Sequence, residues 1–223
     1  GYSRAVDPET DKEFWSLDKD LESVGEFIRL YLTRYQRWHS PLFLAGESYG
    51  TTRAAGLAGY LFDQGVAFNG IVLISTVLNF QTIEFGDGND LPYMLFLPTY
   101  AATAWYHGKL DDELQAKSVA ELLDEVEAWA ETEYAVALGK GDRLSEDERA
   151  LVCAQLAHYT GLDADFIDYT NLRVRDRHFF KELLRDQRRS VGRLDSRFTG
   201  IDRSNVAETI EHDPAMSAIM PPY

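Results

Sequence analysis

The sequence predicts an α/β protein in which parallel strands with flanking helices are followed by a mainly helical region. A helix-like stretch at residues 17–38 precedes an apolar run at 42–45. A second helix-like stretch at 51–62 precedes a second apolar run at 70–75. Helix and strand in alternation are typical of a parallel sheet with right-handed crossovers. Beyond residue 75 we find no further strand-like run.

The first helix is predicted by apolar side chains that recur every three or four residues and share one helical face. They are Leu17, Leu21, Val24, Ile28, Tyr31 and Tyr35. Pro41 breaks the pattern, because the residue before a proline is pushed toward extended geometry. The apolar runs that follow have the length of strands buried on both faces of a parallel sheet.

From the loop at residues 85–92 onward the pattern is helical. Residues 116–138 carry apolar side chains at helical spacing. Ser145 and Glu148 form the signature of a capping box, and Gly161 stands where a helix is expected to stop.

Residues 175–189 predict another helix, with Phe179, Phe180, Leu183 and Leu184 facing inward. The aromatic stretch at 91–108 is expected to pack in the core or over a cleft, where it would line a pocket. Residues 199–223 are expected to form loops or short turns.

The composition is that of a globular protein. The 223 residues have a net charge of −15, with 45% hydrophobic and 26% charged residues. No run approaches the ~20 apolar residues of a spanning helix. A polyanion would be repelled, so nucleic acid is not an expected partner. The one cysteine, Cys153, is expected to be a small core residue because it lies in a helical pattern among alanines and leucines.

Residues 46–50, GESYG, match the pattern G-x-S-x-G between the first strand and the second helix. In a nucleophile elbow the serine takes a strained backbone conformation, and flanking glycines avoid clashes. We predict that Ser48 is a nucleophile and that the backbone N–H of Tyr49 stabilises an oxyanion. Gly46 and Gly50 would permit the turn. The alternative is a glycine-softened turn in which Ser48 caps the helix.

Several segments resemble the serine carboxypeptidase family, in particular its bacterial branch, within the α/β-hydrolase superfamily. They are AGESYGTTRAAGLAGYL, the long helix before it, the opening GYSRA, LPTYAATAWYHGKL and GRLDSRF. The resemblance spans nearly all of the chain. It implies a partial α/β-hydrolase core at residues 1–88 and a helical cap at 89–223. It also implies cleavage of the C-terminal bond of peptide substrates through an acyl-enzyme on Ser48.

By the same resemblance, Glu47 helps to hold the terminal carboxylate of the substrate. Two carboxylates within hydrogen-bond reach repel, so one must carry a proton, and acid pH would favour cleavage. The alternative is that Glu47 pairs with a neighbour such as Arg53. Many eukaryotic members of the family have Ala-Gly where this chain has Gly50 and Thr51, so the resemblance does not imply a side-chain preference.

A serine nucleophile needs a base, and the α/β-hydrolase order places an acid and a histidine after the serine. The histidines that follow Ser48 all fall in the helical region or the tail: His107, His158, His178 and His212. We expect them to have surface or packing roles. The catalytic Asp and His, and the glycine-rich loop for the second oxyanion donor, are expected outside this chain. The chain would then be part of a longer enzyme and inactive alone.

No metal-ligand spacing, phosphate loop or dinucleotide fingerprint is found, so we expect no cofactor and no metal. Acids within 111–148 and bases within 173–203 are expected to be solvated helix faces, some paired with each other. The alternative is that one arginine of the helical region lies near the substrate. An esterase or acyltransferase of the same fold and a non-catalytic peptide-binding protein are the alternative functions. The family likeness implies a secreted or periplasmic protein; compartment and oligomeric state do not follow from the residues.

Overall fold

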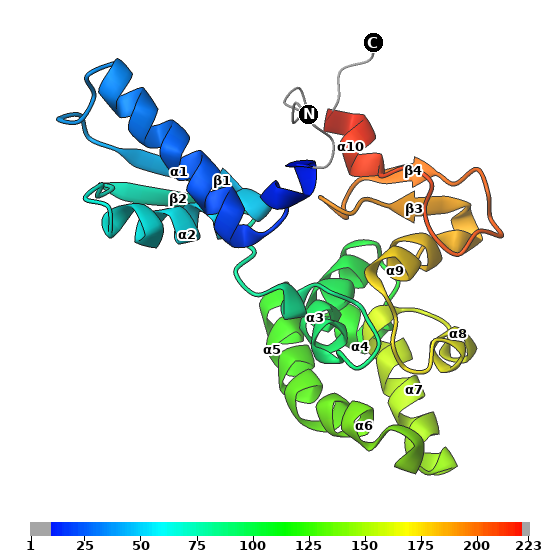
Figure 1. The fold of residues 1–223 in the computed structure, drawn as a ribbon. Coiled ribbons are helices and arrows are strands. Elements are labelled where there is room, and N and C mark those ends of the chain that lie inside the picture. Colours follow the sequence, from blue (N-terminus) through cyan, green and yellow to red (C-terminus); the bar gives the residue numbers. More distant parts are fainter. Residues whose placement is uncertain (1–9, 220–223) are drawn as a thin grey trace. The chain divides into compact units, whose positions relative to one another are not determined.

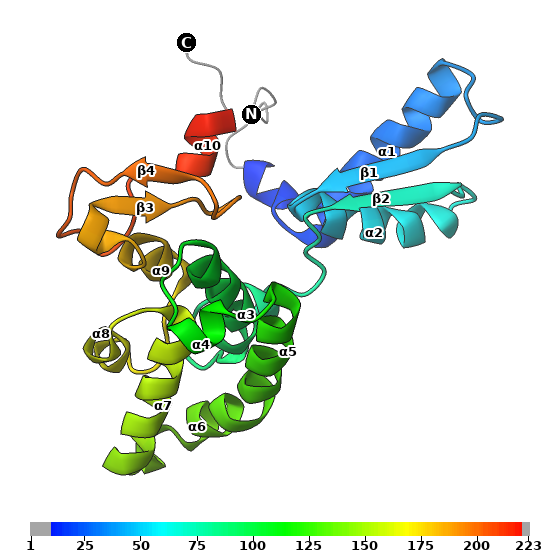
Figure 2. The same ribbon diagram turned by 180° about the vertical axis from the view of Figure 1, so that it is seen from behind.

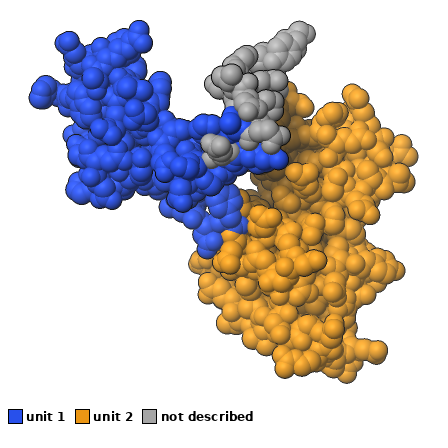
Figure 3. Space-filling view, viewed as in Figure 1, with its two compact units in different colours: residues 1–80 blue, residues 81–223 orange. Residues whose placement is uncertain are grey.

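The computed structural model describes residues 10–219, except the side chains of residues 11 and 13. Contacts divide the chain into unit 1, Gly1–Phe80, and unit 2, Gln81–Tyr223 (Figure 3). The division falls ahead of residue 88, where the sequence placed a boundary. The opening GYSRA lies outside the described residues. The fold is mixed α/β and mostly helical, with a small two-stranded parallel sheet (Figure 1).

Unit 1 is a two-stranded parallel sheet with two long helices on one side of it (Figures 1 and 2). Its elements are η1 (Thr10–Phe14), α1 (Leu17–Arg34), β1 (Phe43–Glu47), α2 (Tyr49–Phe62) and β2 (Gly70–Ile74). The strands pair from Phe43 with Gly70 to Glu47 with Ile74. The predicted parallel pairing of these two strands is therefore confirmed.

The buried face of α1 differs from the prediction at both ends of the helix. Leu21 and Leu32 are buried, whereas Leu17, Tyr31 and Tyr35 are exposed. The helix ends earlier than predicted, and Gln36 beyond it has a φ of 54°. The error has a simple cause: steps of three or four residues fit two neighbouring stripes of α1. The stripe that contains Leu32 belongs to the buried cluster that includes Leu57 and Leu61 of α2.

The strands of unit 1 are more exposed than the double-sided burial that the sequence predicted. Phe43 is 67% exposed, and Val72 and Ile74 are 52% and 50% exposed. That expectation is wrong for the described part of unit 1. Here the helices cover one side of the sheet, and the outer edge of each strand pairs with no further described strand.

Unit 2 is a group of helices that includes one short antiparallel strand pair. Its elements are α3 (Leu91–Tyr106), α4 (Asp112–Gln115), α5 (Val119–Trp129), the π-helical turn η3 (Ala130–Tyr134), α6 (Ala135–Lys140), η4 (Gly141–Arg143), α7 (Glu146–Thr160), α8 (Ala164–Tyr169), α9 (Asp176–Glu182), η5 (Arg185–Gln187), β3 (Arg189–Val191), β4 (Thr199–Ile201) and α10 (Pro214–Ile219); η2 (Phe80–Thr82) spans the division.

Three local predictions in unit 2 are confirmed. Ser145 and Glu148 form the reciprocal capping box at the start of α7. Gly161 ends that helix with a φ of 67°, in the left-handed region that glycine tolerates. Cys153 is buried in the core.

The core of unit 2 is built around the aromatic stretch of α3. Tyr93, Leu97 and Tyr100 are buried, and the Tyr100 ring stacks on Phe179 of α9 with centroids 4.2 Å apart. The predicted inward residues Phe179, Phe180, Leu183 and Leu184 are all buried. Core packing is thus the role of most of this stretch.

Three expectations for unit 2 are wrong. The helix predicted over 175–189 ends at Glu182, and the absence of strands after residue 75 is contradicted by β3 and β4. The tail likewise contains β4 and α10. Strands of three residues are too short to show an alternating pattern, which is why the sequence did not reveal them. No described helix has both the length and the apolar character needed to cross a bilayer.

Candidate functional site

Ser48 occupies the corner between β1 and α2. Its backbone has φ 55° and ψ −124°, a conformation that favours glycine and strains any other residue. The side chain is exposed and makes no capping hydrogen bond to α2. The alternative of a serine cap therefore has no hydrogen bond to support it.

Two sets of contacts hold this corner in place. The backbone N–H of Ser48 donates to the carbonyl oxygen of Ile74 at 3.0 Å, which extends the sheet ladder to the serine itself. A Cβ atom at Gly46 would lie 2.0 Å from the carbonyl oxygen of Gly50, so position 46 has no room for a side chain. At Gly50, by contrast, a Cβ would meet nothing within 4 Å. Only Gly46 is therefore required sterically.

The sequence analysis missed the part played by two threonines. The Thr51 hydroxyl donates to the Ser48 carbonyl oxygen at 2.7 Å and accepts from the N–H of Val77 at 2.9 Å. The Thr52 hydroxyl donates to the Val77 carbonyl oxygen at 2.5 Å. These bonds tie the first turn of α2 to the segment after β2. The signal was available: a pair of hydroxyl residues directly after G-x-S-x-G, where an apolar helix face is expected.

Tyr49 begins α2, so its N–H belongs to the group of first-turn donors that have no partner within the helix. Its hydroxyl donates to Asp20 Oδ2 of α1 at 3.1 Å, and the Arg53 guanidinium lies 5.2 Å from its ring centroid. Burial, with the hydrogen bond to Asp20, raises the pKa of Tyr49. The Tyr49 side chain is thus anchored to α1.

Glu47 is the last residue of β1 and is exposed. Its carboxylate has no hydrogen bond or ion pair among the described residues. Arg53, the neighbour considered as its partner, instead donates to both carboxylate oxygens of Asp20 at 2.7 and 2.8 Å. The alternative pairing of Glu47 with Arg53 is wrong in this structure.

A second serine lies at the same edge of the sheet. Ser75 directly follows β2, is exposed and has a φ of 52°. Because β1 and β2 are parallel, their carboxyl ends meet at one edge. No helix starts at Ser75, so no set of first-turn N–H groups follows it. A substitution at Ser75 is therefore a suitable control for the same substitution at Ser48.

The histidines are distributed over both units. In unit 1, His39 precedes β1 while Ser48 follows it, so the five-residue strand separates them. In unit 2, His107 Nε2 lies 2.7 Å from the Ser196 carbonyl oxygen, and His158 Nδ1 lies 2.6 Å from Asp111 Oδ2. Both are polar contacts within unit 2, and the surface or packing roles expected of these two histidines remain a prediction. His212 is exposed.

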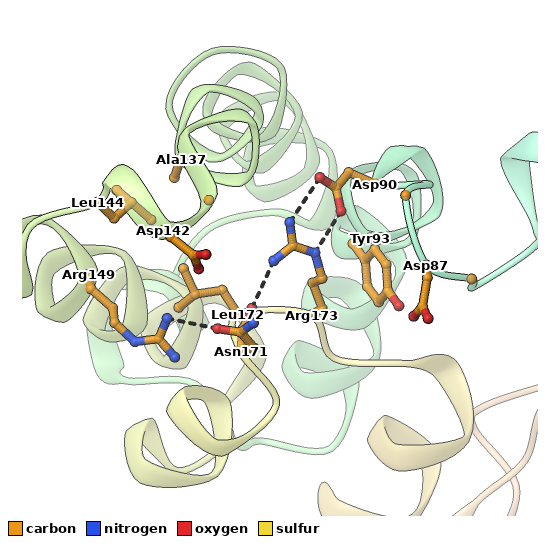
Figure 4. Close-up of a pocket in the computed structure, with 13 residues that line it drawn as sticks. Asp87, Asp90, Tyr93, Ala137, Asp142, Leu144, Arg149, Asn171, Leu172 and Arg173 are labelled. Atoms are coloured by element: carbon orange, nitrogen blue, oxygen red, sulfur yellow. Dashed lines mark hydrogen bonds and ion pairs between the residues drawn. The ribbon is translucent and has the colours of Figure 1, made fainter.

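Unit 2 contains a pocket of about 600 Å³ between the loop after η2, α3 and the segments around α7 (Figure 4). Arg173 donates to both oxygens of Asp90 at 2.6 and 2.9 Å. Arg149 donates to Asn171 Oδ1 at 2.9 Å and to Asp168. Since both guanidinium groups are held by oxygens of unit 2 itself, they brace the pocket walls and offer little to an anion.

The charged segments do not pair in the way the sequence predicted. Those bases of 173–203 that form ion pairs bind acids outside 111–148, for example Arg185 with Glu182 and Arg197 with Asp195. Among the described residues no ion pair joins the two segments. Nor do these residues include a group of three or more His, Cys, Asp or Glu side chains placed to hold a metal.

The corner at Ser48 is thus an exposed, strained serine between a parallel strand and a helix. Comparison of the chain with family models, with curated proteins and with solved structures gives no match.

Proposed function

We propose that this chain supplies the nucleophile of a serine hydrolase of the α/β-hydrolase type, with Ser48 as the residue that becomes acylated. One observation carries the proposal: an exposed serine with φ 55° and ψ −124°, placed between strand β1 and the 14-residue helix α2. The strained backbone of Ser48 lowers the stability of the fold, and no capping hydrogen bond of its side chain compensates for that loss. Such strain is typical of nucleophile elbows.

The start of α2 suits the chemistry of acyl transfer. The helix N-terminus carries partial positive charge and directs its first N–H groups outward. In the proposed reaction Ser48 Oγ attacks the substrate carbonyl, and the Tyr49 N–H donates to the oxyanion that forms. The hydroxyl proton passes to a base and then to the leaving group, and water releases the acyl group.

The base is the part that unit 1 does not supply. His39 lies at the opposite end of β1 from Ser48, so we propose that the catalytic histidine and its acid come from residues outside this chain. The exposed apolar strand residues support this proposal. Phe43, Val72 and Ile74 are at least half exposed, which is expected of a sheet that needs further strands to cover it.

The proposed substrate is the C-terminal peptide bond, and Glu47 would bind the terminal carboxylate. The Glu47 carboxylate, which adjoins Ser48 in the chain and has no partner among the described residues, supports this role. As ionised groups the two carboxylates repel, so the contact requires one proton and binding should strengthen toward acid pH. In Glu47→Gln this acid dependence should be lost, because an amide donates at every pH. A pH profile for peptide binding that matches wild type would contradict the role of Glu47.

Turnover in the natural protein that carries this chain tests the function. We expect release of the C-terminal residue from an N-blocked dipeptide, with activity lost in Ser48→Ala and retained in Ser75→Ala. Turnover of an ester without the peptide would identify an esterase or acyltransferase. Peptide binding that persists in Ser48→Ala, with no turnover by wild type, would identify a binding protein and contradict the hydrolase proposal.

A further inference from the structure

A second pocket in unit 2, of about 500 Å³, lies between α3, α5 and the turn that joins β3 to β4. Its walls are mostly apolar. They come from Ala102, Trp105 and Tyr106 on α3, from Val119 and Leu123 on α5, and from Leu194 in the turn. The indole N–H of Trp105 already donates to the Lys117 carbonyl oxygen at 3.1 Å. The ring therefore has no remaining polar group to present to the pocket.

Two arginines, Arg193 and Arg197, stand at this pocket and differ in their partners. Arg197 donates to both oxygens of Asp195 at 2.9 and 2.7 Å, which neutralises it. The Arg193 guanidinium makes no hydrogen bond among the described residues. It forms one long ion pair, in which Arg193 Nε lies 3.9 Å from Asp213 Oδ2. Of the described residues that line the pocket, Asp195 is the one acid.

The pocket thus combines an apolar wall with one cation, Arg193, whose guanidinium donates no hydrogen bond to a described residue and has only a long ion pair with Asp213. We propose that it binds an apolar group that ends in a carboxylate, with the apolar part against Trp105 and Leu123 and the carboxylate on Arg193. A guanidinium has a fork of N–H donors that matches a carboxylate. The proposal concerns unit 2 alone and does not depend on the role of Ser48.

The alternatives fit these observations less well. A cationic ligand would find no unpaired acid in the wall. A neutral apolar ligand would displace water from the Arg193 guanidinium and would offer it no hydrogen-bond acceptor in exchange. The volume suits a small molecule or a single chain end, since small-molecule pockets commonly measure roughly 300 to 1,000 Å³. Two sources share the proposed chemistry: a free carboxylic acid and the C-terminal residue of a peptide.

Isothermal titration of the whole chain with octanoate and octan-1-ol tests the proposal, because the probes share one tail and differ in the head group. We expect octanoate to bind at least about tenfold more tightly. Arg193→Gln should remove that difference. Arg177→Gln should retain it, because Arg177 is exposed, has no side-chain partner among the described residues and does not line this pocket. Equal affinities for the two probes in wild type, or an unchanged preference in Arg193→Gln, would overturn the proposal.

A second variant tests the location. Ala102 is half-buried in the wall, so Ala102→Phe should fill the pocket and abolish octanoate binding while the circular dichroism spectrum stays unchanged. Octanoate binding that survives in a folded Ala102→Phe would also overturn the proposal. Acetyl-Ala-Leu and its C-terminal amide distinguish the sources. Binding of the free acid but not of the amide points to a peptide end, and binding of octanoate alone points to a free carboxylic acid.

Discussion

A side chain at Gly46 would place its Cβ 2.0 Å from the carbonyl oxygen of Gly50 and 2.9 Å from the N–H nitrogen of Thr51. Both contacts are with backbone at the start of α2, which cannot move aside as a flexible side chain can. The close approach of β1 to this helix is what turns the chain sharply at Ser48. The turn therefore requires glycine at position 46 for steric reasons, but not at position 50.

We predict that Gly46→Ala lowers the free energy of unfolding of unit 1 by about 3 kcal/mol or more, because the backbone must shift to admit the methyl group. Gly50→Ala is the matched control. With nothing within 4 Å of its Cβ, it should raise the free energy of unfolding by about 0.5 to 1 kcal/mol through helix propensity. Urea denaturation measures both. Equal effects of the two substitutions would contradict the close approach.

The strain at Ser48 predicts an unusual response to glycine. Ser48→Gly removes the cost of a positive φ, whereas Ser48→Ala keeps it. We expect Ser48→Gly to be more stable than Ser48→Ala by about 1 kcal/mol, after allowance for the greater freedom of glycine in the unfolded chain. The two urea midpoints give the comparison. An alanine variant as stable as the glycine variant would mean that the corner is relaxed.

The corner itself could be predicted from the sequence, because a short apolar run, GESYG and an alanine-rich stretch together permit few structures. The bracing by Thr51 and Thr52 could be predicted only in part: the sequence shows the two hydroxyl residues, but their partner Val77 comes from a separate segment after β2. Hydrogen bonds between distant segments leave no periodic trace. The same is true of Asp20, which engages Arg53 and Tyr49 from a different helix.

The periodicity also did not show which residues of a helix face the core. In α1 the sequence could not decide between Tyr31 and Leu32 as the inward residue, and α2 decides it. Further along, β3 and β4 are held by pairs such as Ser190 with Gly200, which are too few to show in a pattern. Local signals with a complete mechanism, such as the Ser145 capping box, were predicted correctly because every partner lies within four residues.

Lys181 and Asp202 form an ion pair whose side chains are 0% and 4% exposed. Removal of one partner leaves an unpaired buried charge, so Lys181→Met and Asp202→Leu should each lower the free energy of unfolding by about 3 to 5 kcal/mol. The double variant should cost less than the sum by about 1 to 3 kcal/mol. Urea denaturation of all four proteins completes the cycle. Additive losses would show that the two groups do not interact.

Burial, with the adjacent Glu125 carboxylate, raises the pKa of Tyr159 to about 12. The folded protein then holds this proton more tightly than the unfolded chain, whose tyrosine pKa is about 10. The resulting stability is fully present below pH ~10 and is lost as pH rises toward 12.

Tyr159→Phe should therefore lose less stability than wild type between pH 9 and pH 11, because phenylalanine has no proton to lose. Urea denaturation at the two pH values gives the comparison, and the other tyrosines cancel between the two proteins. A parallel loss in both would show that the Tyr159 pKa is ordinary.

The most direct test of the role of Ser48 is mass-spectrometric mapping of a fluorophosphonate adduct on the natural protein that carries this chain. The account predicts an adduct on the peptide that contains Ser48, absent in Ser48→Ala and still present in Ser75→Ala. A folded protein that forms no adduct, or forms it on another serine, would contradict the account.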